Sequence, residues 1–251
     1  MPQVYIAWQD PETRSWFPVG SLQRIGGRYR FVYTKGALES HWFVPFGGLP
    51  KLDVVYESES LFPLFANRLI SSSRPEYKDF LRWLNLVDEG ADPLQILSLT
   101  GGRRETDSLI VYSKPEPTSD GRYEVDFFCQ GIRYYPGAVE RVGCLDSGEQ
   151  LYLMPDPQNP HHACAVALRT EDPPVFVGYC PRYLARDFLR LLEGSGEVQV
   201  TVVRVNQDAP IQQRLLCHLS SDWLAGFESC SGSAYEPIPE LASEQVAVAL
   251  A

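Results

Sequence analysis

Histidine and cysteine are the side chains here with the clearest capacity for metal chemistry. His161, His162 and Cys164 lie close together, and Cys217 is followed directly by His218. The spacing of the first three, on a loop leading into a strand, suits tetrahedral zinc poorly without a fourth ligand. Cys217-His218 is the pair able to supply that ligand. Because no CxxC pair accompanies these residues, we expect no metal site and no cofactor.

Catalytic chemistry has little support in the pattern of reactive side chains. The chain has four histidines, with no ordered nucleophile–base arrangement and no paired-carboxylate motif, so we expect a protein that is not an enzyme. Gly101-Gly102-Arg103-Arg104 has the glycines of a phosphate loop, but it lacks the Lys-Ser/Thr ending of that motif. We interpret it as the end of a helix.

Composition indicates a folded chain of two modules. The 251 residues are 44% hydrophobic and 12% aromatic, which favours a substantial core. The net charge of −10 counts against electrostatic coating of duplex DNA. Every Lys or Arg after Lys114 is an arginine, and the planar guanidinium suits both phosphate binding and stacking on bases.

The sequence pattern shows neither a membrane span nor a secretory signal. No apolar run of about 18 residues indicates a membrane span, and the N-terminus lacks a basic region followed by an apolar one. We therefore expect a cytoplasmic protein with no membrane partner. Its six cysteines are expected to stay reduced and to pack mainly as small buried hydrophobes.

The N-terminal half begins with the pattern of an antiparallel meander. Apolar residues alternate over residues 3–10 and 29–33, with a short strand predicted over residues 17–23 between them. The paired glycines Gly26-Gly27 supply the positive φ angles of a tight hairpin turn. An α+β fold is therefore expected for this half.

Helical signals follow the meander. Apolar spacing predicts a helical region over residues 61–69. Ser73 is expected to cap a second helix, with Pro75 in its first turn and Glu76 completing a capping box. This helix would end near Asn85.

The first module is predicted to span residues 1–115. A short helix is expected over residues 92–102 and a closing strand over 109–112. The polar, proline-rich residues 113–121 read as the linker between the modules.

The second module is predicted to span residues 122–225, as a small β-barrel with one main helix. Residues 226–251 are expected to be a flexible acidic tail. The expected strands lie near residues 123–127, 129–134, 150–154, 164–169, 175–179, 198–205 and 214–219, and the helix over 182–192.

Several motifs of the second half occur in an order that resembles the HIRAN family. The resemblance covers roughly residues 122–220 and implies an OB-like barrel that captures the 3′ end of single-stranded DNA. The motifs are GIRYYPG (131–137), LYLMPDPQNP (151–160), AVAL (165–168), VGY (177–179) and PRYLA (181–185).

The resemblance also implies a binding pocket. Tyrosine rings stack on unpaired bases, and arginines pair with phosphate. Without the resemblance, the tyrosines read as core, Asn159-Pro160 as an ordinary turn and Arg182 as a solvated residue. The pocket residues would be Arg133, Tyr134, Tyr135, Asn159, His162, Tyr179 and Arg182.

Two features complicate this pocket. Neighbouring Tyr134 and Tyr135 point to opposite faces if they lie on a flat strand, so one of them at most would stack on a base. The family usually has an acidic residue and then an asparagine where this chain has His162 and Cys164. His162, when protonated, would favour a terminal phosphate instead of a 3′-hydroxyl.

The first half resembles the N-terminal subdomain of HipA-type kinases more faintly, over residues 3–112. The matching features are VGSL (19–22), YRFVY (29–33), LFPLFANRL (61–69) and Gly101-Gly102. The kinase core is absent, since no catalytic Asp loop followed by a metal-binding Asp is found. The main hypothesis is a non-catalytic DNA-end adaptor in repair or defence, with a protein partner docking on residues 1–112. The alternative is an antitoxin-like regulator that binds a HipA-type kinase core.

Overall fold

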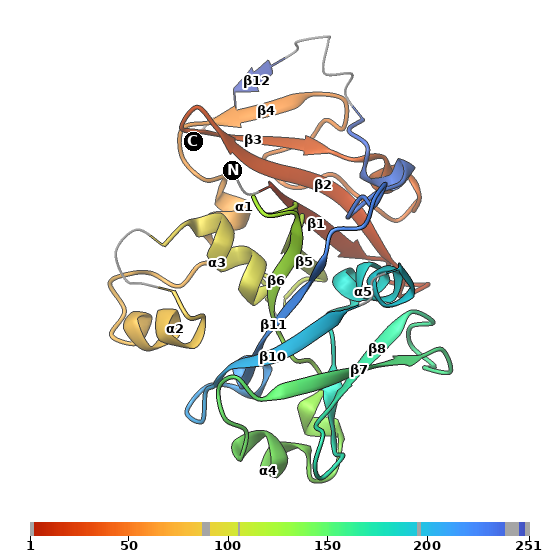
Figure 1. Ribbon diagram of the computed structural model, residues 1–251. Coiled ribbons are helices and arrows are strands. Elements are labelled where there is room, and N and C mark those ends of the chain that lie inside the picture. The colour runs from red at the N-terminus through yellow and green to blue at the C-terminus, as the bar shows by residue number, and fades with distance from the viewer. Residues whose placement is uncertain (1–2, 87–90, 105, 195–196, 239–245, 249–251) are drawn as a thin grey trace. The chain divides into compact units, whose positions relative to one another are not determined.

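The chain forms two compact units in this computed structural model, which describes residues 3–86, 91–104, 106–194, 197–238 and 246–248 (Figure 1). The first unit comprises Met1–Arg74, Gly90–Lys114 and Cys230–Ala251. The second comprises Pro75–Glu89 and Pro115–Ser229. Both units combine β-sheet with short helices, which confirms the α+β class.

The first unit is built on an antiparallel meander, as predicted. In its described part the sheet has six strands in the order β12-β4-β3-β2-β1-β5, and only β12 joins its neighbour β4 in parallel. The strands are β1 (Gln3–Gln9), β2 (Trp16–Ile25), β3 (Arg28–Tyr33), β4 (Val55–Ser58), β5 (Leu109–Ser113) and β12 (Val246–Val248).

Alternation of apolar side chains drives this sheet. The residues that face inward include Val4, Ile6, Phe31 and Tyr33, all fully buried. The Tyr33 hydroxyl donates to the carbonyl of Leu49 at 2.8 Å, which ties a long loop to the core. The remaining elements between β3 and β5 are η1 (Lys35–Leu38), α1 (Pro63–Ala66) and α3 (Pro93–Thr100).

Helix α3 has the predicted termini. The Asp92 side chain accepts from the Leu94 amide at 2.9 Å, which caps the first turn. Gly101 ends the helix in the left-handed region with φ of 73°. The Gly101-Gly102 segment is therefore a helix stop.

Helix α2 (Tyr77–Trp83) begins later than predicted. Glu76, not Ser73, is its N-cap, and no side chain caps it. The Ser73 hydroxyl bonds the Ser71 hydroxyl at 2.8 Å instead. The Ser73 hydroxyl thus bonds within its own turn instead of to the helix, and the expected capping box does not form.

The second unit contains the predicted barrel-like sheet. Its strand order is β6-β11-β10-β7-β8-β9, with every pair antiparallel. The strands are β6 (Arg122–Phe128), β7 (Gln150–Asp156), β8 (Ala165–Arg169), β9 (Phe176–Tyr179), β10 (Val198–Val205) and β11 (Leu215–Asp222). The other elements are η2 (Ile132–Tyr134), α4 (Ala138–Gly143), α5 (Arg182–Gly194), η3 (Ile211–Gln213) and, in the first unit, η4 (Ser233–Tyr235).

A single bridge joins the two edges of this sheet. Gln130, just beyond β6, exchanges two backbone hydrogen bonds of 2.8 Å with Tyr179 of β9. Gly178 permits the close approach, because a Cβ there would lie 2.5 Å from the Gln130 carbonyl oxygen and 2.6 Å from the Cys129 sulfur. The sheet thus closes next to the segment that was predicted to bind.

Helix α5 fills the barrel with one apolar face. Leu184, Phe188 and Leu191 are at most 1% exposed and belong to the core of the unit. The Phe188 ring packs against the rings of Tyr123 and Phe127 of β6. This single long helix matches the prediction.

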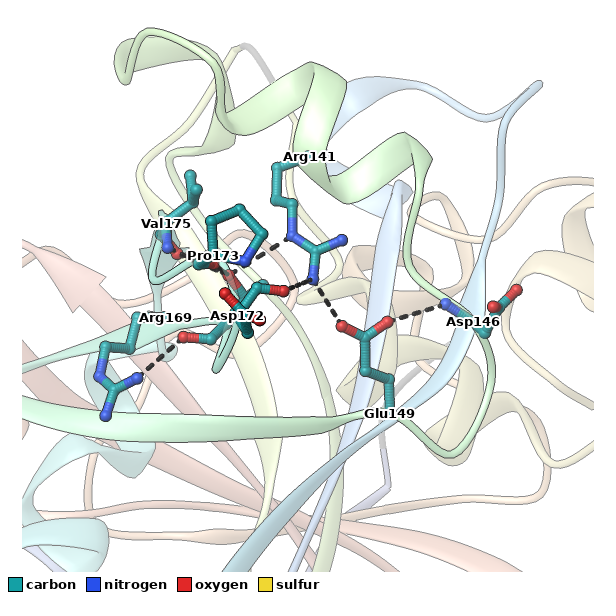
Figure 2. Close-up of polar contacts among 8 residues, drawn as sticks. Arg141, Asp146, Glu149, Arg169, Asp172, Pro173 and Val175 are labelled. Carbon is teal, nitrogen blue, oxygen red and sulfur yellow. Dashed lines mark hydrogen bonds and ion pairs between the residues drawn. The ribbon is translucent and has the colours of Figure 1, made fainter.

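An arginine fixes the loop between β8 and β9 (Figure 2). Arg141 on α4 forms a 2.7 Å ion pair with Glu149. The same side chain donates to the Thr170 hydroxyl and the Asp172 carbonyl, both at 3.4 Å. The Thr170 hydroxyl also accepts from the Val175 amide at 3.1 Å. The start of β9 is therefore held by side-chain hydrogen bonds as well as by its backbone pairing with β8.

The strand predicted near residues 129–134 is wrong. The strand β6 ends at Phe128, Gln130 forms an isolated bridge, and Ile132–Tyr134 forms the 3-10 turn η2. Gly131 precedes this turn with φ of 77°, a left-handed conformation that turns the chain away from the sheet. Tyr134 and Tyr135 therefore do not follow strand alternation.

Part of the predicted tail is packed. Phe227, Ser229 and Cys230 are buried. The Tyr235 ring lies 4.9 Å from the Tyr5 ring in a T-shaped contact. The Ile238 amide donates to the Tyr33 carbonyl at 2.9 Å, and β12 follows farther along. The remaining residues of the predicted tail, 239–245 and 249–251, lie outside the described part.

The helices of the described residues are too short or too polar to cross a membrane.

Candidate functional site

Three aromatic rings cluster beside the bridge that closes the barrel. The Tyr135 ring centroid lies 4.1 Å from that of Phe176 and 6.0 Å from that of Tyr179. Phe176 and Tyr179 make a T-shaped pair at 5.2 Å. All three side chains are only partly buried, so the cluster leaves aromatic surface open for stacking.

A carboxylate lies at the edge of this cluster. Asp156, at the end of β7, accepts from the Tyr179 hydroxyl at 2.7 Å and from the Asn159 amide at 3.1 Å. These two hydrogen bonds, of which the one from Tyr179 has the larger effect, hold the pKa of Asp156 below its usual value. Burial, followed by hydrogen bonds to Tyr135 and Asp156, raises the pKa of Tyr179. The carboxylate is thus ionised and the phenol protonated at neutral pH.

Asn159 shapes the turn that follows Asp156. Its side-chain oxygen accepts from the amides of His161 and His162 at 3.0 and 3.2 Å. The turn is therefore built by the asparagine itself. It brings the two histidines back toward α5.

Positive charge gathers at the start of α5. Arg182 donates to the His161 carbonyl at 2.8 Å. Burial, then the charges of Arg182 and Arg186, lowers the pKa of His162. Among the described residues, neither arginine has a carboxylate within ion-pair distance. The lowered pKa favours the neutral form of His162 at pH 7, which counts against the hypothesis that a protonated His162 selects a terminal phosphate.

Arg133 and Tyr134 extend the cluster into solvent. The Arg133 guanidinium lies over the Tyr134 ring, 4.7 Å from its centroid, and Tyr134 is 68% exposed. Gly131 links this pair to the others, since a Cβ there would lie 3.8 Å from Tyr134 and 4.0 Å from Tyr179. The turn η2 thus removes the difficulty that strand alternation raised, because both tyrosines lie around the same glycine.

The structure brings Tyr135, Tyr179, Asn159, His162 and Arg182 together through the contacts above. Arg133 and Tyr134 form a pair of their own beside them, next to Gly131. Sequence reasoning assigned no role to Asp156, Phe176 or Arg186. Asp156 carried a signal, because it follows Leu151 and Leu153 in the alternating strand and directly precedes the Asn159 turn. Phe176 and Arg186 had no local signal, since their places depend on folding.

The metal candidates separate in the structure. His218 bonds Asp126 through Nδ1 at 2.7 Å, and this bond raises the pKa of His218. Cys217 is fully buried in the core, where burial raises the pKa of its thiol. The described residues contain no group of His, Cys, Asp or Glu arranged to hold a metal ion. Cys129, Cys180, Cys217 and Cys230 are the buried cysteines.

Comparison with known families decides the nature of this segment. Residues 123–222 match the HIRAN domain. This confirms the HIRAN resemblance over almost the whole range in which it was expected. The match contains Arg133 to Tyr135, the Asn159 turn and the start of α5, while the first unit lies outside it.

Two solved structures resemble the chain. One is a protein from Lactobacillus plantarum, with 22% identity and a TM-score of 0.33, covering 40% of this chain and 97% of that chain. The other is the HIRAN domain of human HLTF, with 17% identity and a TM-score of 0.31, covering 41% of this chain and 81% of that chain. No curated protein matches the sequence significantly. The HipA-like resemblance of the first half stays a prediction.

Proposed function

We propose that the second unit binds the 3′ end of single-stranded DNA through the cluster around Gly131. The residues we assign to this site are Arg133, Tyr134, Tyr135, Asn159, His162, Tyr179 and Arg182. The module acts without catalysis, as an adaptor that brings the rest of the chain to a DNA end in repair or defence. The match of residues 123–222 to the HIRAN domain supports this assignment.

The observation that carries the proposal is the pairing of open aromatic rings with arginines that lack carboxylate partners. An arginine without a carboxylate partner keeps its charge available for a phosphate. Among the described residues Arg133, Arg182 and Arg186 have no carboxylate partner. Stacking on Tyr134 or Tyr135 contributes about 1–3 kcal/mol per base, and charge-assisted bonds to phosphate add to it.

Asp156 gives one end of the site a negative charge, opposite the arginines of α5. Its ionised carboxylate accepts a hydrogen bond from a hydroxyl and repels a phosphate, whereas Arg182 and Arg186 attract phosphate. A strand end that places its last hydroxyl near Asp156 and its last phosphodiester near α5 satisfies both. We therefore expect a 3′-hydroxyl to bind more tightly than a 3′-phosphate.

Fluorescence anisotropy tests the proposal at fixed, moderate salt. Labelled strands would carry a 3′-hydroxyl, a 3′-phosphate or a 3′ end blocked in a hairpin, with blunt duplex for comparison. The free 3′-hydroxyl strand is expected to bind best, and the double variant Arg133→Ala, Tyr134→Ala to lose at least about tenfold in affinity.

Arg24→Ala serves as the matched control, because it removes one exposed arginine from the first unit. It should bind like the wild type. Equal binding of blocked and free ends, or no binding to any strand, would refute end recognition.

A further inference from the structure

One face of strands β7, β8 and β9 extends the candidate site beyond its described edge. Directly opposed residues of antiparallel strands carry their side chains on the same face. Tyr152 is opposite Arg169, Met154 is opposite Ala167, and Ala167 is in turn opposite Tyr179. This face therefore runs without interruption from Tyr179 to Tyr152.

The barrel core uses the other face of the same strands. Leu151, Val166, Leu168 and Val177 are at most 2% exposed and belong to the core. On the outer face Tyr152, Met154 and Arg169 keep part of their surface open. Between these large side chains lies the small residue Ala167, which is 1% exposed, so the accessible part of this face consists of an aromatic, a thioether and a guanidinium group.

The far end of this face repeats the chemistry of Arg133 and Tyr134. The Arg169 guanidinium lies over the Tyr152 ring, 4.6 Å from its centroid. Arg169 also donates to the Thr170 carbonyl at 2.9 Å and points away from the Arg141–Glu149 pair (Figure 2). No carboxylate in the described part of the chain forms an ion pair with it. An arginine held against a tyrosine presents both a stacking plane and a phosphate partner.

We propose that Tyr152 and Arg169 form a second nucleotide position, which holds a base on the 5′ side of the bound 3′ end. The inference rests on the proposed function, because it takes the strand end to lie at Asp156 and Tyr179. Tyr152 is four positions from Asp156 along β7, about 13 Å at roughly 3.3 Å per residue. A strand that keeps the ~3.4 Å spacing of stacked duplex DNA would span this distance with about four nucleotides.

Glu171 moderates this position. The Tyr152 hydroxyl bonds its carboxylate, and this bond raises the pKa of Tyr152. The bond holds the ring in place, while the negative charge opposes an approaching phosphate. Glu171→Gln keeps an acceptor for the hydroxyl and removes the charge. This variant is expected to bind long strands more tightly than the wild type.

The test is the dependence of affinity on strand length. Strands of two, four and eight nucleotides would share one 3′-hydroxyl end and carry the fluorophore at the 5′ end. The wild type is expected to gain at least about fivefold between the shortest and the longest strand. Tyr152→Ala and Arg169→Ala should lose this gain while binding the shortest strand normally. Tyr152→Phe, which keeps the ring, should retain it.

The outcomes separate the two proposals. Normal binding of the shortest strand also shows that a variant is folded. If the wild type gains nothing with length, or the alanine variants gain as much as it does, the second position is refuted and the end-binding site stands. If no strand binds to the wild type, the proposed function fails, and the second position fails with it.

Discussion

Asp187 of α5 is an ionisable side chain enclosed by the barrel core. It is 6% exposed. It accepts from the Tyr123 hydroxyl at 3.2 Å and from the Ser229 hydroxyl. Burial outweighs these bonds and raises the pKa of Asp187. The folded protein therefore holds this proton at pH values where the unfolded chain releases it.

This elevation predicts a stability that falls with rising pH. Between the usual aspartate pKa of about 3.9 and the raised pKa in the fold, the folded state binds more protons than the unfolded state, so the free energy of unfolding decreases as pH rises. Asp187→Asn keeps an acceptor for both hydroxyls and removes the charge. In this variant, the part of the pH dependence of the unfolding free energy that comes from residue 187 should vanish. The variant should also be more stable than the wild type at pH 7.

Thermal denaturation between pH 4 and pH 8 measures the effect. Asp146→Asn is the matched control, because Asp146 is exposed in the turn before β7, and its pH slope should equal that of the wild type. If the stability of Asp187→Asn changes with pH as steeply as that of the wild type, the prediction is contradicted.

At the scale of single residues, the resemblance to the HIRAN family selected the candidate residues, and most of them lie in short motifs of the sequence. Arg133, Tyr134 and Tyr135 are consecutive, and Asn159 builds its own turn. The bond between Asp156 and Tyr179 spans 23 residues, so no local pattern contains it. The lowered pKa of His162 likewise depends on burial and on arginines of another element.

Among the elements, helix α2 shows how a segment can belong to a unit that its place in the sequence does not indicate. Arg82 and Trp83 both bond Asp208, at 2.7 and 3.2 Å. The buried Asn206 side chain donates to the carbonyls of Trp83 and Gln213, both at 2.9 Å. These contacts lie within the second unit, although α2 precedes the predicted linker.

Asn206→Ala is therefore expected to loosen α2. The variant leaves two carbonyls without their donor, which costs about 1–3 kcal/mol in the free energy of unfolding. Urea denaturation measures this cost, and hydrogen exchange over residues 77–84 should show faster opening of the helix. Gln207→Ala, which removes an exposed bond to the Gly143 carbonyl, is the control and should change neither. Unchanged exchange in Asn206→Ala would show that other contacts hold α2.

Turn chemistry explains which elements were predictable. The pattern predicted β1 to β3 and α3 correctly, because the hairpin turn and the two ends of α3 carry residues that favour the observed geometry, namely Gly26-Gly27, Asp92 and Gly101. It missed η2, although Gly131 lies directly before it. Glycine permits a left-handed φ without requiring one, and here the closing bridge between Gln130 and Tyr179 selects it. The packing of Tyr235 and Ile238 was missed because their partners, Tyr5 and Tyr33, are distant in sequence.

For the whole molecule, net charge limits how it can bind DNA. At −10 the chain as a whole repels a polyanion, so affinity must come from a few arginines close to the strand. Binding through many phosphates would give a steep salt dependence, whereas two to four contacts give a slope of log K against log salt of about −1.4 to −2.8 for a single strand.

Titrations of the eight-nucleotide strand at several salt concentrations measure this slope. Arg182→Ala and Arg169→Ala should each make it shallower by about 0.7, the contribution of one phosphate. Tyr135→Ala should weaken binding at every salt concentration and leave the slope unchanged, because stacking releases no counterions. A wild-type slope steeper than about −5 would mean that the strand contacts many more phosphates than the proposed site holds. An unchanged slope in Arg182→Ala would remove the start of α5 from the path of the DNA backbone, leaving the aromatic cluster as the binding surface.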